Sequence, residues 1–351
     1  MMKLGLSAED LARRLDELDL SPRERAATVG DLVERCRQNE ADRSRYLMRF
    51  VTLLADEAPA VRGWAIVGVV LCDERGEHVE RLLRLLEDPS PGVRLQVLHA
   101  LGPLGLTEHH DRFAACLRDP DRLVRMAAAV ALASGGDFRG TDVLIDAAQR
   151  RDTRLDALYA LRRAAAEAPE LHDRIEAMAR KLYGGLLTHR FDRVGAAALL
   201  ASMGHEDARG LLVERAGKRT VERPMALELC GELRIPGGEA LVARVATDPK
   251  DPLRGTALRA LGSYRAAGAE EVCGEVLLNP AEDPDVRCDA AEGLLLSGSE
   301  EARRVLERAS QEIEDERVRG VAATSLSLFG RSAREVRLYL PLTGEEVMAH
   351  E

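Results

Sequence analysis

Apolar residues recur along this chain with the period of an amphipathic helix, in segments that repeat one motif. The motif reads Asp-Pro, three residues, Val or Leu, Arg, two residues, Ala or Val, two residues and Ala-Leu. Its clearest copies are residues 88–102, 119–133 and 248–262. Counted from the Val or Leu as zero, apolar residues fall at positions 0, 4, 7 and 8. These positions share one face of a helix, so each copy predicts a helix with a single buried stripe.

The motif returns at regular intervals through most of the chain. Its arginine is found at Arg62, Arg94, Arg125, Arg154, Arg223, Arg254, Arg287 and Arg319. A degenerate copy places Gly195 in the arginine slot between Arg154 and Arg223, and the average step is then about 32 residues. This period is typical of helix-pair repeats that stack into a solenoid.

Each repeat is predicted to be a helical hairpin. A polar first helix, such as residues 77–88, precedes the motif helix, which starts with a Ser or Asp cap and a proline at Ser90-Pro91, Asp251-Pro252 and Asp283-Pro284. Ala dominates positions 4 and 7, where neighbouring helices approach closely. Because one hairpin cannot bury its own stripe, the hairpins must stack, and we predict an all-α α-solenoid.

The Asp-Pro, Val-Arg and Ala-Leu-Gly elements resemble the HEAT-repeat family, in particular the short HEAT-like repeats of phycobilin lyase subunits. The resemblance covers about residues 57–330 and implies a right-handed α–α superhelix of about nine helical hairpins with terminal caps. It also implies a structural ladder of acidic and arginine side chains, which extends to Asp56, Arg62, Asp88, Arg94, Asp119, Arg125, Asp248 and Arg254. We interpret the ladder as ties between repeats and helix caps; the alternative is a row of arginines that binds anions.

Three regions depart from the repeat. Residues 1–56 are helical but off-pattern, and we expect an N-terminal helical cap. Residues 162–193 stretch one step of the array, which predicts a longer, irregular repeat that is either a hinge or a tolerated insertion. Residues 331–351 are expected to form a C-terminal cap and tail.

The charge balance bears on the class of partner. The chain carries 50 Lys and Arg residues against 60 Asp and Glu residues, a formal charge of −10. An acidic chain lacks the basic stripe that binds phosphate backbones, which argues against nucleic acid as a partner. Arginine greatly outnumbers lysine, a bias that we interpret as high-GC coding and a bacterial origin.

Cysteine usage and apolar runs bear on the compartment. The 6 cysteines lie far apart without a CxxC motif, which fits a reducing environment. The N-terminus has no apolar signal region, and the longest apolar run, residues 64–72, is too short to cross a bilayer. We therefore expect a cytoplasmic protein with no membrane span.

Candidate catalytic chemistry is sparse. Deoxyhypusine hydroxylases resemble this architecture and carry His-Glu iron ligands after the Val-Arg position, whereas no copy of the motif here has His-Glu at that place and His205-Glu206 falls in a predicted turn. His109 and His110 are adjacent, so their side chains diverge by about 100° on a helix. Trp64 falls at position 3, which we assign to packing on the core side. We predict no catalytic residue, no metal and no cofactor.

An apolar strip follows positions 2 and 6 of the motif helices, which point away from the buried stripe. Its members are Leu95, His99, Met126, Val130, Leu155, Tyr159 and Leu200. We interpret the strip as a concave groove for an amphipathic helix or extended peptide. Burial of these side chains by tight superhelical curvature and a homodimer seam are the alternatives.

These observations favour a non-catalytic scaffold or adaptor that binds another protein along its concave face. The alternative from another class is an accessory enzyme subunit, either lyase-like or related to the HEAT-like nucleic-acid repair proteins. The oligomeric state stays open.

Overall fold

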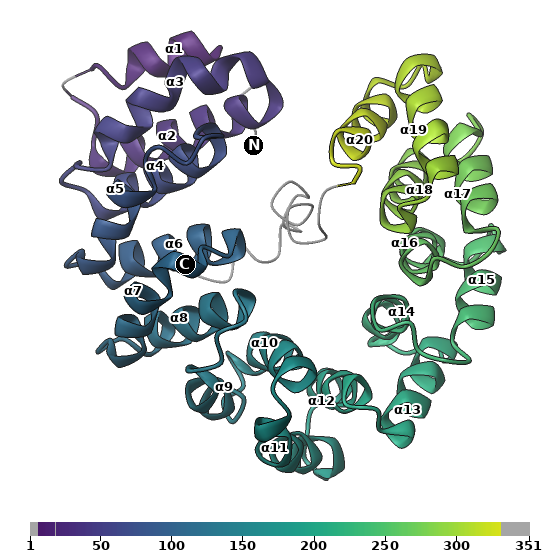
Figure 1. Ribbon diagram of the computed structural model, residues 1–351. Helices are drawn as coiled ribbons and strands as arrows, with labels where there is room; N and C mark the ends of the chain where they lie inside the picture. The colour runs from purple at the N-terminus through teal and green to yellow at the C-terminus, as the bar shows by residue number, and fades with distance from the viewer. Residues whose placement is uncertain (1–5, 18, 331–351) are drawn as a thin grey trace. The chain divides into compact units, whose positions relative to one another are not determined.

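The structure is a computed structural model that describes residues 6–17 and 19–330, and every regular element in those ranges is helical. The contacts within the chain separate two compact units, one ending at Ala147 and the other beginning at Ala148. Figure 1 shows that each unit consists of helices packed in two layers. The predicted all-α solenoid architecture is confirmed.

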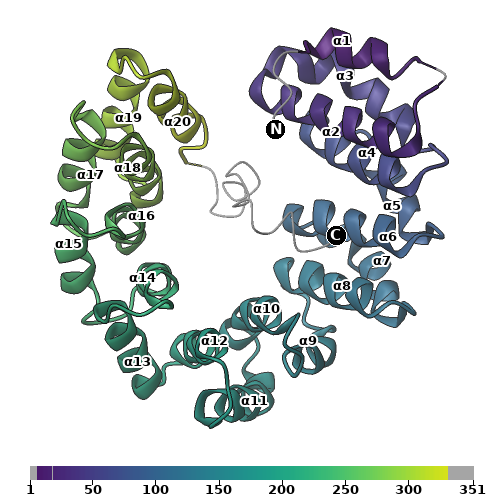
Figure 2. The ribbon, with the colours of Figure 1, turned by 180° about the vertical axis from the view of Figure 1, so that it is seen from behind.

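In the first unit, α2, α4, α6 and α8 stack in chain order, and we call them the inner helices (Figures 1 and 2). The remaining helices pack against this row as the outer layer. The elements are α1 (Ala8–Arg14), α2 (Pro22–Gln38), α3 (Glu40–Leu53), α4 (Pro59–Cys72), α5 (Val79–Arg84), η1 (Leu85–Glu87), α6 (Pro91–Leu101), η2 (Gly102–Leu104), η3 (Thr107–His109), α7 (His110–Ala115), η4 (Cys116–Arg118), α8 (Arg122–Ser134) and α9 (Thr141–Ala147).

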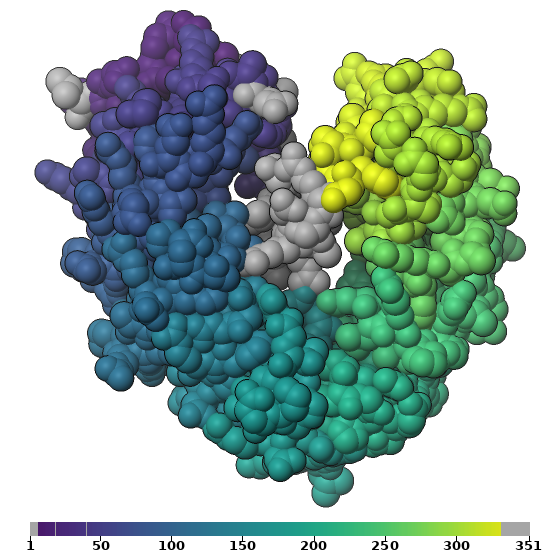
Figure 3. Space-filling model, in the orientation of Figure 1, coloured from purple at the N-terminus to yellow at the C-terminus, as the bar shows by residue number. Residues whose placement is uncertain are grey.

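The second unit repeats this arrangement with α10, α12, α14, α16, α18 and α20 as inner helices. Figure 3 shows one face of this unit, with the colour running from teal at α10 to yellow at α20. The elements are α10 (Arg154–Glu167), η5 (Pro169–Leu171), α11 (His172–Gly184), α12 (Arg190–Ser202), α13 (Glu206–Gly217), α14 (Arg223–Glu232), α15 (Glu239–Thr247), α16 (Arg254–Tyr264), α17 (Ala269–Leu278), α18 (Pro284–Ser297), α19 (Glu300–Glu312) and α20 (Glu316–Ser327).

Polar caps and proline fix where inner helices begin. The Asp121 carboxylate accepts hydrogen bonds from the backbone N–H groups of Leu123 (2.8 Å) and Val124 (3.2 Å) at the start of α8. At the start of α18, Asp283 caps the helix and Pro284 takes the first helical position, where its missing N–H costs nothing. The predicted starts at Ser90-Pro91 and Asp283-Pro284 are confirmed, whereas the one at Asp251-Pro252 is wrong, because α16 begins at Arg254 with Leu253 as its N-cap.

Small residues let the inner helices of the second unit approach at backbone distance. A Cβ atom on Gly262 would collide with the carbonyl oxygen of Gly293, and one on Gly231 would lie 2.6 Å from the Cα atom of Ala260. Only glycine fits at these contacts, because any Cβ would force the two helices apart. This explains the small residues of the repeat in terms of helix approach.

The regions that depart from the repeat differ in how much the structure describes. Residues 162–193 comprise the end of α10, the short η5, the long outer helix α11 and the loop to α12. In the first unit, α3 packs on α4 as an outer helix does on its inner partner. The predicted C-terminal cap and tail at residues 331–351 lie outside the described residues.

Candidate functional site

In the first unit, ladder arginines join each repeat to the next. Arg62 donates to the Asp88 carboxylate at 2.8 and 2.6 Å, and Arg94 donates to Asp119 at 2.7 Å through two nitrogens. Both pairs are buried and bidentate, the geometry that suits a guanidinium facing a carboxylate. Each arginine also donates to a backbone carbonyl six residues earlier, as Arg62 does to Asp56 at 2.8 Å. Within one repeat, the arginine thus donates to the backbone carbonyl of the acidic residue. The carboxylate of that residue accepts hydrogen bonds from the arginine of the preceding repeat.

The ladder extends further in the first unit than its predicted members. Arg25 on α2 donates to the Asp56 carboxylate at 3.0 Å, so the N-terminal helices take part in the same network. Arg125 donates to the backbone carbonyls of Asp119 at 2.7 Å and Pro120 at 3.0 Å. With so many donors engaged by the protein itself, these arginines act as structural ties.

In the second unit, the acidic partners of the ladder arginines occupy sequence positions other than the one that the motif predicts. Arg223 donates to the Asp251 carboxylate at 3.0 and 2.7 Å, and Arg254 pairs with Glu282. Asp248 is exposed, and its carboxylate accepts a hydrogen bond from the backbone N–H of Lys250 at 2.9 Å. The rung at this repeat is therefore formed by Asp251, three residues after the predicted acid.

Electrostatics support a stabilising role for the rungs. Burial alone would raise the pKa of Asp119, but hydrogen bonds from Arg94 and from the backbone N–H of Asp121 outweigh it, so the pKa lies below its ordinary value. Asp251 shows the same balance, with Arg223 as its cation. A depressed carboxyl pKa means that the charged form is stabilised by folding.

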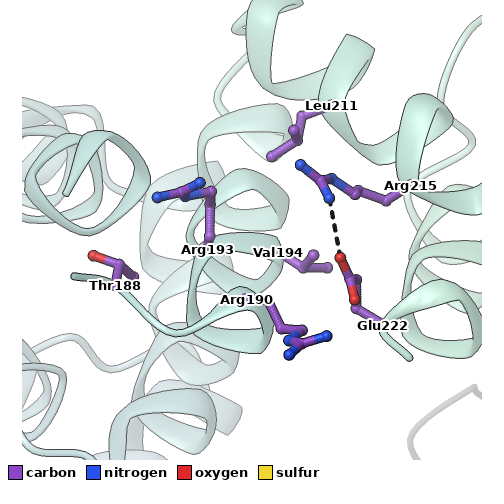
Figure 4. Close-up of a pocket in the computed structure, with 7 residues that line it drawn as sticks. All are labelled: Thr188, Arg190, Arg193, Val194, Leu211, Arg215 and Glu222. Atoms are coloured by element: carbon purple, nitrogen blue, oxygen red, sulfur yellow. Dashed lines mark hydrogen bonds and ion pairs between the residues drawn. The ribbon is translucent and has the colours of Figure 1, made fainter. Parts of the chain in front are cut away.

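One rung is missing where Gly195 takes the arginine slot, and a pocket of about 90 Å³ lies beside it, between α12, α13 and the residue that precedes α14. Figure 4 shows Arg215 reaching Glu222 across this pocket, at 3.1 Å between Nη1 and Oε1. The lining residues are Thr188, Arg190, Arg193, Val194, Leu211, Arg215 and Glu222. Glu222 is only 2% exposed, so its carboxylate depends on this partner.

The pocket suits water. Among the described side chains, Oε2 of Glu222 and Nε of Arg193 are buried without a hydrogen-bond partner. The volume is large enough for water, and the charged side chains in the lining supply the partners that ordered water needs. We therefore interpret the pocket as a hydrated gap in the ladder.

The predicted apolar strip in the first unit is partly accessible. His99 is exposed, Leu95 and Val130 are half-buried, and Met126 is buried. Trp64, which we assigned to the core side, is 39% exposed and packs one part of its ring over Gly30 of α2. The assignment of Trp64 to the core side was wrong. Because position 30 has no side chain, the indole rests on the surface of that helix and stays partly exposed.

In the second unit the strip is split between exposed and buried members. Leu155 and Tyr159 on α10 are 38% and 43% exposed, whereas Leu200 on α12 is fully buried. The side chains of Leu155 and Met225 converge from α10 and α14 on Gly195 of α12. The inner face of α12 is therefore covered by its neighbours.

A charged cluster that the sequence did not identify occupies the inner surface of α14, α16 and α18. Nη2 of Arg259 donates to Glu228 at 2.8 Å, Nη1 bonds Asp289, and Nε lies 3.9 Å from Glu292. Burial raises the pKa of Glu292, Arg259 lowers it, and Asp289 and Glu228 raise it, leaving it above its ordinary value. Burial also raises the pKa of Asp289 despite its bond to Arg259. The single positive charge of this guanidinium therefore does not neutralise the three carboxylates around it.

Glu232 links this cluster to the exposed residues of α10. Its carboxylate accepts a hydrogen bond from Arg162 at 2.7 Å and one from the Tyr159 hydroxyl at 3.4 Å. The Arg162 guanidinium also lies 4.2 Å from the centre of the Tyr159 ring, a cation–π contact. Glu228 and Glu232 are four residues apart on α14, so they share one face of the helix. The switch from apolar to charged residues at position 6 was the sequence signal for this cluster.

The described residues offer little for metal chemistry. No group of three or more His, Cys, Asp or Glu side chains within them is arranged to hold a metal ion. His109 lies 3.9 Å from Glu80 while His110 lies 3.5 Å from Asp137, so the adjacent histidines turn to different partners. No helix in the same part of the chain has both the length and the apolar character needed to cross a bilayer.

Comparison with known families decides the identity of the repeat. A family model described as HEAT repeats matches residues 47–133, 79–168 and 238–327, which together make up more than half of the chain. The chain belongs to the HEAT-repeat family. The resemblance seen in the motif is thereby confirmed. A comparison of this HEAT-repeat chain with curated proteins finds no match.

Solved structures with a similar course of the chain are distant from this HEAT-repeat protein in sequence. Kap121p is 12% identical with a TM-score of 0.43, and the similarity covers 97% of this chain and 47% of Kap121p. The CpcE–CpcF complex of phycocyanin lyase from Nostoc sp. PCC7120 is 17% identical (TM-score 0.43; 89% and 99% covered). Human deoxyhypusine hydroxylase is 16% identical (TM-score 0.30; 83% and 98% covered). Similarity at this level does not transfer a function.

Proposed function

We propose that this HEAT-repeat protein is a non-catalytic scaffold that binds a partner polypeptide along its inner helices. The observation that carries the proposal is the exposure of large apolar side chains there: Trp64 in the first unit, and Leu155 and Tyr159 in the second. Aromatic side chains on a surface that water reaches are typical anchors of protein interfaces.

The proposed partner is a peptide or an amphipathic helix. Both present side chains at intervals that inner helices stacked in a row can contact in turn. We include the cytoplasm of a bacterium in the proposal, on the basis of the composition and of 6 cysteines that are free and buried. The alternative of an accessory enzyme subunit has no specific observation in its favour.

Site-specific photo-crosslinking in cells tests the proposal. A benzoylphenylalanine replaces Tyr159 in one variant and the exposed Arg304 of the outer helix α19 in the control. We expect a light-dependent crosslinked species from position 159 that the control does not give. Adding Leu155→Asp should reduce its yield about tenfold, since the anchor beside the probe is replaced by a charge.

Thermal unfolding followed by circular dichroism accompanies the experiment. Because Leu155 is well exposed, Leu155→Asp should melt within a few degrees of the wild type. Crosslinks that are equal from positions 159 and 304, or that are unchanged by Leu155→Asp, would contradict the proposal.

A further inference from the structure

We infer that the inner surface of the second unit binds a basic amphipathic peptide, with its cationic side chains on α14 and α18 and an apolar side chain on α10. The inference rests on the proposed function and names the chemistry of the partner. We call the receiving residues the acidic inner surface: Glu228, Glu232, Arg259, Asp289 and Glu292.

The first argument is charge. Among the described residues, Arg259 contacts three carboxylates of this surface, those of Glu228, Asp289 and Glu292, and Arg162 contacts the fourth, that of Glu232. Arg259 is divided among three of the carboxylates, and Glu292 is the most distant from it, at 3.9 Å. A Lys or Arg side chain from a partner would complete the neutralisation in a partly buried setting, where a charge pair is worth more than on an open surface.

The second argument is the apolar neighbour. Glu232 joins Tyr159 through the hydroxyl hydrogen bond, so the acidic inner surface continues into the exposed Tyr159 and Leu155. A peptide that crosses from α10 to α18 therefore meets an apolar anchor first and carboxylates next. An amphipathic segment with aliphatic and basic residues matches that order.

The third argument is the exclusion of other ligands. The carboxylates repel a phosphate backbone, so nucleic acid does not fit this surface. They are also not among any described group of side chains arranged to hold a metal ion. A basic polypeptide supplies both cationic side chains for the carboxylates and an apolar side chain for Leu155 and Tyr159.

Selection from a random peptide library tests the inference with a defined probe. A library of 16-residue peptides displayed on phage is selected against the full chain, and enriched peptides are resynthesised for fluorescence anisotropy. We expect enrichment of Lys and Arg near aliphatic or aromatic residues, and affinities that fall as salt is raised.

Two double variants give the matched comparison. Glu228→Gln with Glu292→Gln removes two charges and leaves the Arg259–Asp289 pair in place. Glu271→Gln with Glu275→Gln removes the same charge from exposed positions on the outer helix α17. We expect about tenfold weaker peptide binding for the first and less than twofold change for the second. Glu228→Gln alone, at a half-exposed site, serves if the double variant melts early.

The outcomes separate this inference from the proposed function. Enriched peptides that are not basic, or that bind Glu228→Gln/Glu292→Gln as tightly as the wild type, overturn the inference. If such peptides still lose binding with Leu155→Asp, the scaffold proposal stands without it. If no selected peptide responds to any inner-helix variant, both fail.

Discussion

The two units use the same repeat to build different inner surfaces. In the first unit, the Phe50 ring occupies the space beside Gly68 of the inner helix α4, since a Cβ on Gly68 would lie 2.5 Å from that ring. In the second unit, Gly293 lets α18 approach α16 until a Cβ would lie 2.6 Å from the Leu258 carbonyl oxygen. Glycine thus makes room for an aromatic ring at α4 and for backbone contact at α18, although both kinds of glycine occur in each unit: a Cβ on Gly140 of the first unit would lie 2.7 Å from the Cα atom of Ala129.

The inner surfaces of the two units also differ in charge. When helices approach closely, the side chains at their rims lie within reach of one another, and Arg259 on α16 can contact acids on both α14 and α18. In the first unit, the corresponding surface carries half-buried Leu95 and Val130 and exposed Trp64. The inner surface of α14, α16 and α18 is thus charged, whereas the surface formed by Trp64, Leu95 and Val130 in the first unit is apolar.

The largest effect on stability should come from breaking a regular rung of the first unit. Its comparison is the repeat of the second unit in which the predicted acid does not form the rung. Asp119→Ala leaves the buried Arg94 guanidinium without its carboxylate and should lower the free energy of unfolding by about 3 kcal/mol. Asp248→Ala removes an exposed carboxylate that no ladder arginine contacts, and we expect a loss below about 1 kcal/mol. Urea titration measures both; equal losses would show that the displaced rung was misassigned.

Next in size is the contrast between the two leucines of the predicted strip. Leu200→Ala should cost about 2–4 kcal/mol, because it empties a fully buried site on α12. Leu155→Ala at its exposed site should cost less than about 1 kcal/mol. Similar urea midpoints for the two variants would mean that α12 is not covered in solution.

Backbone contact in the second unit can be broken by a single methyl group. Gly262→Ala places a Cβ against the Gly293 carbonyl and should destabilise the protein by about 1–3 kcal/mol. Gly210→Ala is the control, since its Cβ would meet nothing within 4 Å in the middle of α13. The control variant should stabilise the protein by about 0.5 kcal/mol through helix propensity. If it destabilised the protein instead, the loss in Gly262→Ala could not be assigned to the backbone contact.

The pH dependence of stability should have opposite sign at the two kinds of acid. Glu292 has a raised pKa in the folded state, so its contribution is fully present below the unfolded pKa and is lost as pH rises through the folded value. The groups facing it are Arg259, Asp289 and Glu228. Relative to wild type, Glu292→Gln should therefore gain stability as pH rises above about 4.

Asp251 gives the opposite case, because its pKa is lowered. Its contribution is present above the unfolded pKa and is lost as pH falls through the folded value. Asp251→Asn should thus lose most against wild type near neutral pH and little in acid. Urea midpoints from pH 3 to 8 measure both variants, and parallel curves would refute the contrast.

The smallest effect uses the one tryptophan as a reporter of the first unit. Trp64 is partly exposed, so a peptide that covers it should shift its emission to shorter wavelength. A peptide bound to the acidic inner surface should leave the emission unchanged while its own anisotropy rises. If Glu228→Gln/Glu292→Gln abolished the emission shift, the emission shift and the anisotropy rise would come from one binding site. The two inner surfaces would then not be separate sites.

Sequence reasoning succeeded where the signal was local or periodic. The helix starts at Pro91 and Pro284 follow from proline's fixed φ and its missing N–H, which are properties of the residue itself. It failed for Trp64, because whether an indole is covered depends on the residue opposite it, here Gly30 on another helix. The charged cluster was visible in part, as Glu228, Arg259 and Glu292 at one repeat position, but Asp289 comes from another position of the motif.

By itself, the sequence determined the repeat, its helical hairpins, its arginine positions and its family, since each depends on period and residue type along the chain. Only the tertiary structure decided that Leu200 is buried while Tyr159 is exposed, and that Asp251 rather than Asp248 forms the rung. The reason is geometric: equivalent positions of the motif face water or protein according to how closely the neighbouring helices approach, and that distance is set by residues about one repeat away.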